Sequence, residues 1–118
     1  MMHTFDHEKL DVYRAAIEFV VLVDKIVEHF PRGRGYLADQ LLRAGSSISL
    51  NIAEGAGEYS SSEKSRFYRM AKRSATECAG IFDICKQLGI VDETWFVKGR
   101  ELLWRILAML IKMVQKAE

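Results

Sequence analysis

The feature that most constrains the fold is a long helical pattern in the third quarter of the chain. Small and apolar side chains recur there in unbroken steps of four and three, namely at Phe67, Ala71, Ser74, Cys78, Ile81, Cys85 and Leu88. This spacing keeps one face of a helix apolar, so it predicts a single amphipathic helix over residues 61–88. Ser60 and Glu63 have the spacing of a capping box, and Gly89 followed by Ile90 fits a Schellman-type end.

Three more helices are predicted around this one, over residues 7–29, 36–55 and 93–116. We expect Asp6 to cap the first, which must end before Pro31 because proline cannot continue a helix. Short connections make consecutive helices antiparallel neighbours. The predicted fold class is therefore all-α, an antiparallel up-down-up-down four-helix bundle.

Glycines and surplus apolar residues add two expectations. The second helix ends in Gly55-Ala56-Gly57, where a glycine of positive φ would form the C-cap. The first helix has a second apolar stripe beside its core stripe, and the fourth is also rich in apolar residues. The additional stripe consists of Tyr13, Ile17, Val20 and Val27. This surface exceeds what a soluble monomer usually exposes, so we expect a homo-oligomer.

Length and composition predict one compact domain. The 118 residues are 49% hydrophobic and include a single proline, which suits a helical protein with one core. Apolar runs such as residues 19–23 are too short to span a bilayer, and the N-terminus lacks the pattern of a targeting segment. Cys78 and Cys85 are about 10.5 Å apart along one helix, too far for a mutual disulfide. We therefore expect a cytoplasmic protein with reduced core thiols and no membrane association.

Charge is unevenly distributed, although the net charge is only +1. Residues 62–75 hold five bases against one acid. Arg66, Arg69 and Arg73 fall within about 60° on a helical wheel, and Lys64 and Lys72 flank them. A phosphate backbone calls for regularly spaced cations on a rigid element, so these five are candidate nucleic-acid-binding residues. The alternative is a solvated charged surface on an amphipathic helix.

A second constellation is polar and lies on the predicted second helix. Gln40, Arg43, Ser47, Asn51 and Glu54 share an arc of about 80° beside the core stripe. A hairpin of the second and third helices would bring Arg43 near Ser74 and Glu77, and Glu54 near Lys64 or Arg66. We expect these residues, with Glu77, to form a structural polar seam that fixes helix register. A functional site at an oligomer interface is the alternative.

Catalytic chemistry is not indicated by the sequence. Di-metal sites in helical bundles use Glu-x-x-His repeats, which this chain lacks, and His3 and His7 lie near a chain end. Cys78 and Cys85 lie on the predicted core stripe, so neither is expected to be an activated thiol. No glycine-rich phosphate loop or Ser/His/Asp grouping is present. We therefore expect no enzyme activity, no cofactor, no metal and no small-molecule substrate.

A family resemblance is carried by the segment Ser-Ile-Ser-Leu-Asn-Ile-Ala-Glu-Gly at residues 47–55. It is supported by flanking residues, namely Gln40, Arg43, Ser62, Glu63, Phe67, Ala71, Ser74 and Glu77. Over nearly the whole chain the sequence resembles the small proteins encoded by intervening sequences in 23S rRNA genes. A wider relative is the accessory protein of diversity-generating retroelements. The resemblance implies a four-helix bundle that assembles into a ring of five.

The interpretation that combines these features is a non-catalytic, ring-forming binding protein. Its basic surface on the third helix would contact the phosphates of a nucleic acid, either structured RNA or DNA. The alternative is a scaffold or adaptor that presents an apolar or acidic surface of the first helix to another protein. The near-neutral net charge counts against nucleic acid, because strongly basic totals are the usual sign of such proteins.

Overall fold

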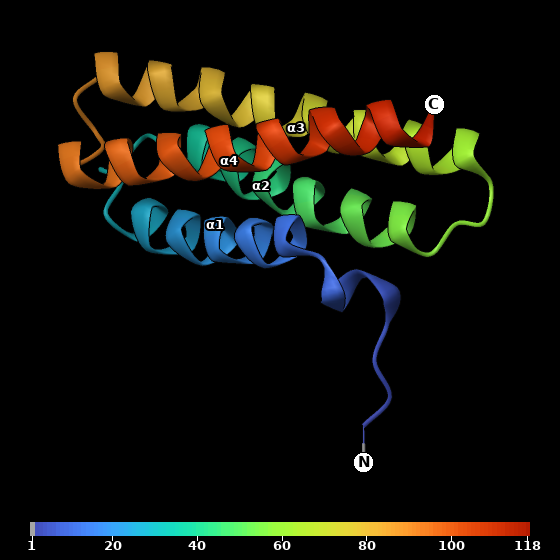
Figure 1. The fold of residues 1–118 in the computed structure, drawn as a ribbon. Helices are drawn as coiled ribbons and strands as arrows, with labels where there is room; N and C mark the ends of the chain where they lie inside the picture. Colours follow the sequence, from blue (N-terminus) through green and yellow to red (C-terminus); the bar gives the residue numbers. More distant parts are fainter. Residues whose placement is uncertain (1) are drawn as a thin grey trace.

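The computed structural model describes residues 2–118, which form four α-helices preceded by a short 3₁₀ helix. The elements are η1 (Asp6–Lys9), α1 (Asp11–Glu28), α2 (Gly35–Ala56), α3 (Ser61–Gln87) and α4 (Glu93–Ala117). Consecutive helices run antiparallel and α4 returns beside α1, so each helix packs against two others (Figure 1). The described residues include no strand, and the predicted all-α class is confirmed.

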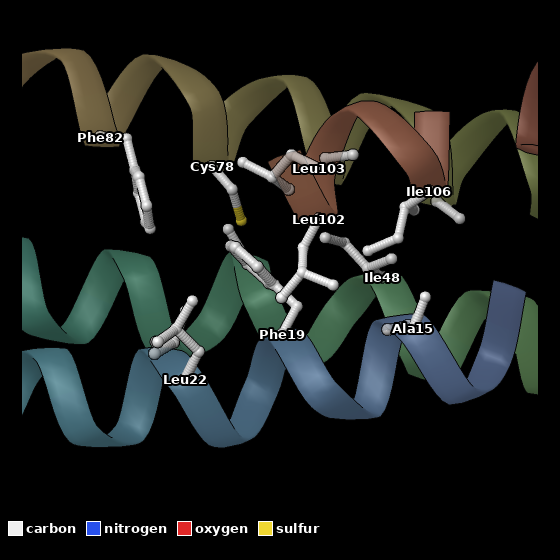
Figure 2. Packing of buried hydrophobic residues seen from close by; sticks show 14 of the residues in the cluster. Ala15, Phe19, Leu22, Ile48, Cys78, Phe82, Leu102, Leu103 and Ile106 are labelled. Atoms are coloured by element: carbon white, nitrogen blue, oxygen red, sulfur yellow. The ribbon is translucent and has the colours of Figure 1, made fainter. Parts of the chain in front are cut away.

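The core contains buried side chains from all four helices. Phe19 of α1, Ile48 of α2, Cys78 of α3 and Ile106 of α4 are all inaccessible to solvent and face one another along the bundle axis (Figure 2). Their apolar surface leaves water on folding, which is the main force that holds the helices together. The amphipathic patterns in the sequence therefore identify the inward side of each helix.

Two glycines determine how closely α3 approaches its neighbours. A Cβ atom on Gly55 of α2 would lie 2.7 Å from Cε1 of Tyr68, and one on Gly99 of α4 would lie 2.2 Å from Cε2 of Phe82. Only glycine therefore fits at these positions without displacing a buried ring. Because α3 is enclosed on both sides, Tyr68 and Phe82 join its buried surface, while Leu88 of the predicted stripe stays exposed.

The beginning of the first helix differs from the sequence-based prediction. Residues Asp6–Lys9 form a separate 3₁₀ turn, Leu10 is extended with φ −87° and ψ 126°, and α1 begins only at Asp11. A start at residue 7 after an Asp6 cap is therefore wrong. The break at Leu10 turns η1 toward α2, which it contacts, instead of prolonging α1. Helical periodicity does not reveal such a tertiary contact.

The C-terminal ends of α2 and α3 show one wrong and one confirmed prediction. At the end of α3, Gly89 has φ +69° and the Ile90 N–H donates to the Cys85 carbonyl at 3.1 Å, which is the predicted Schellman geometry. At the end of α2, Gly57 instead has φ −83°. A positive φ is not needed there, because the Lys64 side chain binds the last carbonyls.

Exposed apolar side chains are spread over the whole bundle and are not concentrated on α1 and α4. Tyr13 and Val27 of the second α1 stripe pack against the core, whereas Ile17 remains exposed. The exposed large apolar residues on the α-helices are Ile17, Val21, Tyr36, Leu50, Met70, Ile84, Val97, Trp104 and Ile111. Trp104, with 61% of its surface exposed, is the most prominent aromatic among them.

Candidate nucleic-acid interface

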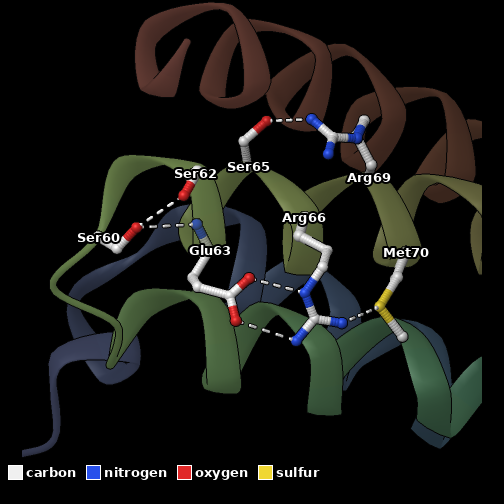
Figure 3. A network of polar contacts seen from close by, with 7 residues as sticks. All are labelled: Ser60, Ser62, Glu63, Ser65, Arg66, Arg69 and Met70. Carbon is white, nitrogen blue, oxygen red and sulfur yellow. Dashed lines mark hydrogen bonds and ion pairs between the residues drawn. The ribbon is translucent and has the colours of Figure 1, made fainter.

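The predicted basic surface begins at the capped N-terminus of α3. The Ser60 hydroxyl accepts a hydrogen bond from the Glu63 N–H at 3.3 Å. The Glu63 carboxylate does not return to the Ser60 backbone, so the capping box is only half formed. It accepts two hydrogen bonds from Arg66 instead, at 2.8 and 3.3 Å (Figure 3). This pairing lowers the pKa of Glu63 and raises the pKa of Arg66.

Arg69 also has partners within the chain. Its guanidinium donates to the hydroxyl of buried Ser65 and lies 3.1 Å from the Glu118 carboxylate (Figure 3 shows the Ser65 bond). Glu118 follows the last residue of α4, so this contact ties the α3 surface to the end of another helix. The positive charge of Arg69 is partly neutralised by that carboxylate.

Lys64 points toward α2 and not toward solvent. Its ammonium donates to the carbonyls of Gly55 and Ala56 at 3.2 and 3.0 Å. These carbonyls belong to the last turn of α2, where backbone acceptors lack helical partners and the helix dipole is negative. Lys64 therefore stabilises the end of α2, a role that its position in the sequence did not suggest.

Lys72 and Arg73 are the two remaining candidates on this surface. Neither side chain forms a hydrogen bond or ion pair with any residue among 2–118, and Arg73 is exposed. The five predicted cations thus share one helix but differ in availability. Three are engaged by partners within the chain, and two are free to bind an external anion.

The polar seam lies between α2 and α3. Arg43 pairs with Glu77, and the Ser74 hydroxyl donates to the Ser47 hydroxyl at 2.9 Å. Asn51 donates from its amide to the Ser47 hydroxyl at 3.0 Å and to the Ser47 carbonyl at 2.9 Å. These contacts fix the antiparallel register of the two helices. The interactions of Asn51, however, are with its own helix and do not cross to α3.

Gln40 and Glu54 do not join this network. Both are exposed, and neither forms a hydrogen bond or ion pair within the described chain, residues 2–118. Glu54 does lie near Arg66, as expected, and its charge helps to raise the pKa of Arg66, but the two side chains form no ion pair. Lys64 binds backbone carbonyls, and Arg66 is held by Glu63, so neither cation is left for Glu54.

The two cysteines lie in the core, away from solvent. Cys78 and Cys85 are both buried and unpaired. Burial, with a smaller effect of Glu77, raises the pKa of Cys78 to about 12, so its thiol stays protonated at neutral pH. Among residues 2–118 no group of three or more His, Cys, Asp and Glu side chains could hold a metal ion. Over the same residues, every helix is too short or too polar to cross a membrane.

A second set of cations, which the sequence interpretation missed, lies on α4. Lys98, Arg105 and Lys112 are exposed and recur every seven residues. None of these α4 cations forms a hydrogen bond or ion pair with a residue of the described range 2–118. The seven-residue spacing was visible in the sequence, but α4 is rich in apolar residues and the charges between them were overlooked.

Comparisons with known proteins agree with this fold. The profile of the family described as 23S rRNA-intervening sequence protein matches residues 8–112. A crystal structure of a protein of unknown function from the S23 ribosomal protein family of Bacteroides thetaiotaomicron superposes with a TM-score of 0.81. That protein is 19% identical, and the alignment covers 87% of this chain and 97% of the other. No curated protein matches the sequence.

Proposed function

We propose that this chain, which belongs to the 23S rRNA-intervening sequence protein family, is a non-catalytic binding protein that contacts structured RNA or another nucleic acid through α3. The observation that carries the proposal is the pair Lys72 and Arg73, which lack partners in residues 2–118 and lie beside Arg66 and Arg69. Phosphate contacts of this kind confer affinity without sequence specificity. A cytoplasmic location is part of the proposal, because structured RNA is found there.

The proposal includes assembly into a homo-oligomeric ring, most simply the pentamer that the family resemblance implies. Support comes from the large apolar side chains that are exposed on every α-helix, including Trp104. A ring would repeat the α3 surface once per subunit, so weak contacts would add up to tight binding. Light scattering should give a multiple of 13.5 kDa at micromolar concentration, and a monomer mass would contradict this part.

Nucleic-acid binding is tested by reversing the free cations and leaving the engaged ones in place. In the double variant Lys72→Glu, Arg73→Glu, retention of structured RNA should fall at least about tenfold at matched salt. The slope of log affinity against log salt should also decrease by about 2, because two phosphate contacts are lost. A matched control is Lys9→Glu, Arg32→Glu, which changes the net charge equally at two exposed positions that also lack partners within residues 2–118.

The engaged arginines provide a second variant. Reversing Arg66, Arg69 and Arg73 together should abolish retention of RNA or DNA while helicity and oligomer mass persist, because all three are exposed. If both α3 variants bind RNA as well as the control does, the basic surface of α3 contacts only solvent and not nucleic acid. The scaffold or adaptor interpretation should then replace nucleic-acid binding, whereas the oligomer would be unaffected by that result.

A further inference from the structure

The two halves of the bundle carry opposite charge. Residues 2–58, which include α1 and α2, hold nine acidic and six basic side chains, whereas residues 59–118, with α3 and α4, hold eleven basic and seven acidic ones. The α1–α2 pair and the α3–α4 pair lie on opposite sides of the bundle (Figure 1). Electrostatic attraction therefore favours contacts in which the acidic half of one copy meets the basic half of another.

An exposed apolar strip runs along α4, where Trp104 borders the groove toward α3 and Arg105 the groove toward α1. Val97, Trp104 and Ile111 recur every seven residues, about 21 Å from first to last, and each is directly followed by one of the α4 cations. A heptad spacing of this kind is what a helix presents to a second helix. Tryptophan and arginine, here Trp104 and Arg105, are enriched at protein interfaces.

The outer side of α1 combines exposed apolar residues with acidic side chains, so its charge is opposite to that of the α4 cations. Ile17 and Val21 are exposed on adjacent turns, within an arc of about 120° that also contains three exposed acids. These α1 acids are Glu18, Asp24 and Glu28. None of them forms a hydrogen bond or ion pair within residues 2–118. Arg14 in the same arc is already paired with Asp11 at 2.8 Å, which leaves Lys25 as the one base without such a partner there.

The charges on the two surfaces do not form ion pairs with each other within one copy. Glu18 and Arg105 border the same open groove between α1 and α4, yet they form no ion pair with each other. Both helices thus keep apolar side chains in contact with water next to charges that lack a partner among the described residues. A second copy would supply what each surface lacks, namely an apolar cover and the opposite charge.

We infer that copies of this chain associate head to tail, with the apolar strip and cations of α4 in one copy seated on Ile17, Val21 and the acids of α1 in the next. Such a contact uses two different surfaces, so it repeats around a ring. The inference rests on the proposed oligomer and specifies which surfaces build it.

The experiment uses charge exchange on the full chain. Changing Lys98, Arg105 and Lys112 to Glu makes both surfaces acidic, and the mass by light scattering should fall to 13.5 kDa with unchanged helicity. Adding Glu18→Lys, Asp24→Lys and Glu28→Lys to that variant restores the net charge of the parent. The α4 surface is then acidic and the α1 surface basic, so the two surfaces attract each other again. The combined variant should regain the parent mass.

An uncharged variant tests the apolar strip independently. Trp104→Ala should weaken association at least about tenfold, whereas Tyr59→Ala, at a fully exposed position outside both surfaces, should leave it unchanged. If the α4 charge reversal keeps the parent mass, the interface assignment is wrong although the oligomer stands. If that variant keeps its mass but loses RNA, α4 binds nucleic acid instead. A monomeric parent protein would overturn both the oligomer and this interface.

Discussion

The basic residues of α3 and those of α4 differ in what surrounds them. On α3, Glu63 holds Arg66, Glu118 holds Arg69, and Lys64 binds the carbonyls at the end of α2. On α4, Arg100 lies 3.8 Å from Asp83, but the side chains of Lys98, Arg105 and Lys112 form no hydrogen bond or ion pair among residues 2–118. Equal numbers of cations in a sequence therefore do not mean equal availability. Lys64, Arg66 and Arg69 of α3 are engaged within the fold, whereas Lys98, Arg105 and Lys112 of α4, like Lys72 and Arg73 of α3, are available for contacts between molecules.

The sharpest test of this difference compares two adjacent residues of α4. Gly99→Ala should lower the free energy of unfolding by about 1 to 3 kcal/mol, because the new Cβ would lie 2.2 Å from Cε2 of buried Phe82. Lys98→Ala should change it by less than about 0.5 kcal/mol. Urea denaturation followed by circular dichroism measures both. A large effect of Lys98→Ala would mean that the α4 cations stabilise the fold after all.

A smaller effect is expected for Lys64 on α3. Lys64→Met keeps most of the aliphatic stem but removes the ammonium from the carbonyls of Gly55 and Ala56, so we expect a loss of roughly 1 to 2 kcal/mol. Lys112→Met, an exposed position on α4, is the matched control and should be nearly neutral. Equal effects in the two variants would remove the distinction between engaged and free cations.

The smallest effect concerns the exposed pair of Glu63 and Arg66. The hydrogen bond from Arg66 lowers the pKa of Glu63 below 4.5, so the pair stabilises the folded state above that pH. This contribution should fade as the pH falls through the lowered pKa, because the protonated carboxyl no longer attracts Arg66. Glu63→Gln should therefore be less stable than the parent at pH 7 and equally stable near pH 2. Glu101→Gln on α4, which has no such partner within residues 2–118, should show no comparable convergence.

The helices could be predicted largely because their signals are local. Ser60 and Gly89 lie at the two ends of α3, where the sequence placed them, since capping involves only neighbouring backbone groups. The start of α1 could not be predicted in this way. Its break at Leu10 accompanies the contact of η1 with α2, which is distant in sequence.

At the candidate site, too, local features were predictable and contacts between distant residues were not. The clustering of Arg66, Arg69 and Arg73 on one surface follows from helical spacing and was predictable. Their partners were not predictable, because Glu118 is 49 residues from Arg69 and reaches it only when α4 returns beside α3. The relation to the accessory protein of diversity-generating retroelements also stays a prediction, whereas membership of the 23S rRNA-intervening sequence family is confirmed.

The sequence by itself determined four amphipathic helices, the Ser60 and Gly89 ends of α3 and the antiparallel order, because periodicity, capping and short connections act over a few residues. The tertiary structure alone decided which charges are satisfied within the chain and which apolar residues stay exposed. Lys64 and Lys112 cannot be told apart in sequence, yet one closes the end of a neighbouring helix and the other faces solvent. That difference arises only when helices distant in sequence bring their side chains within hydrogen-bonding distance.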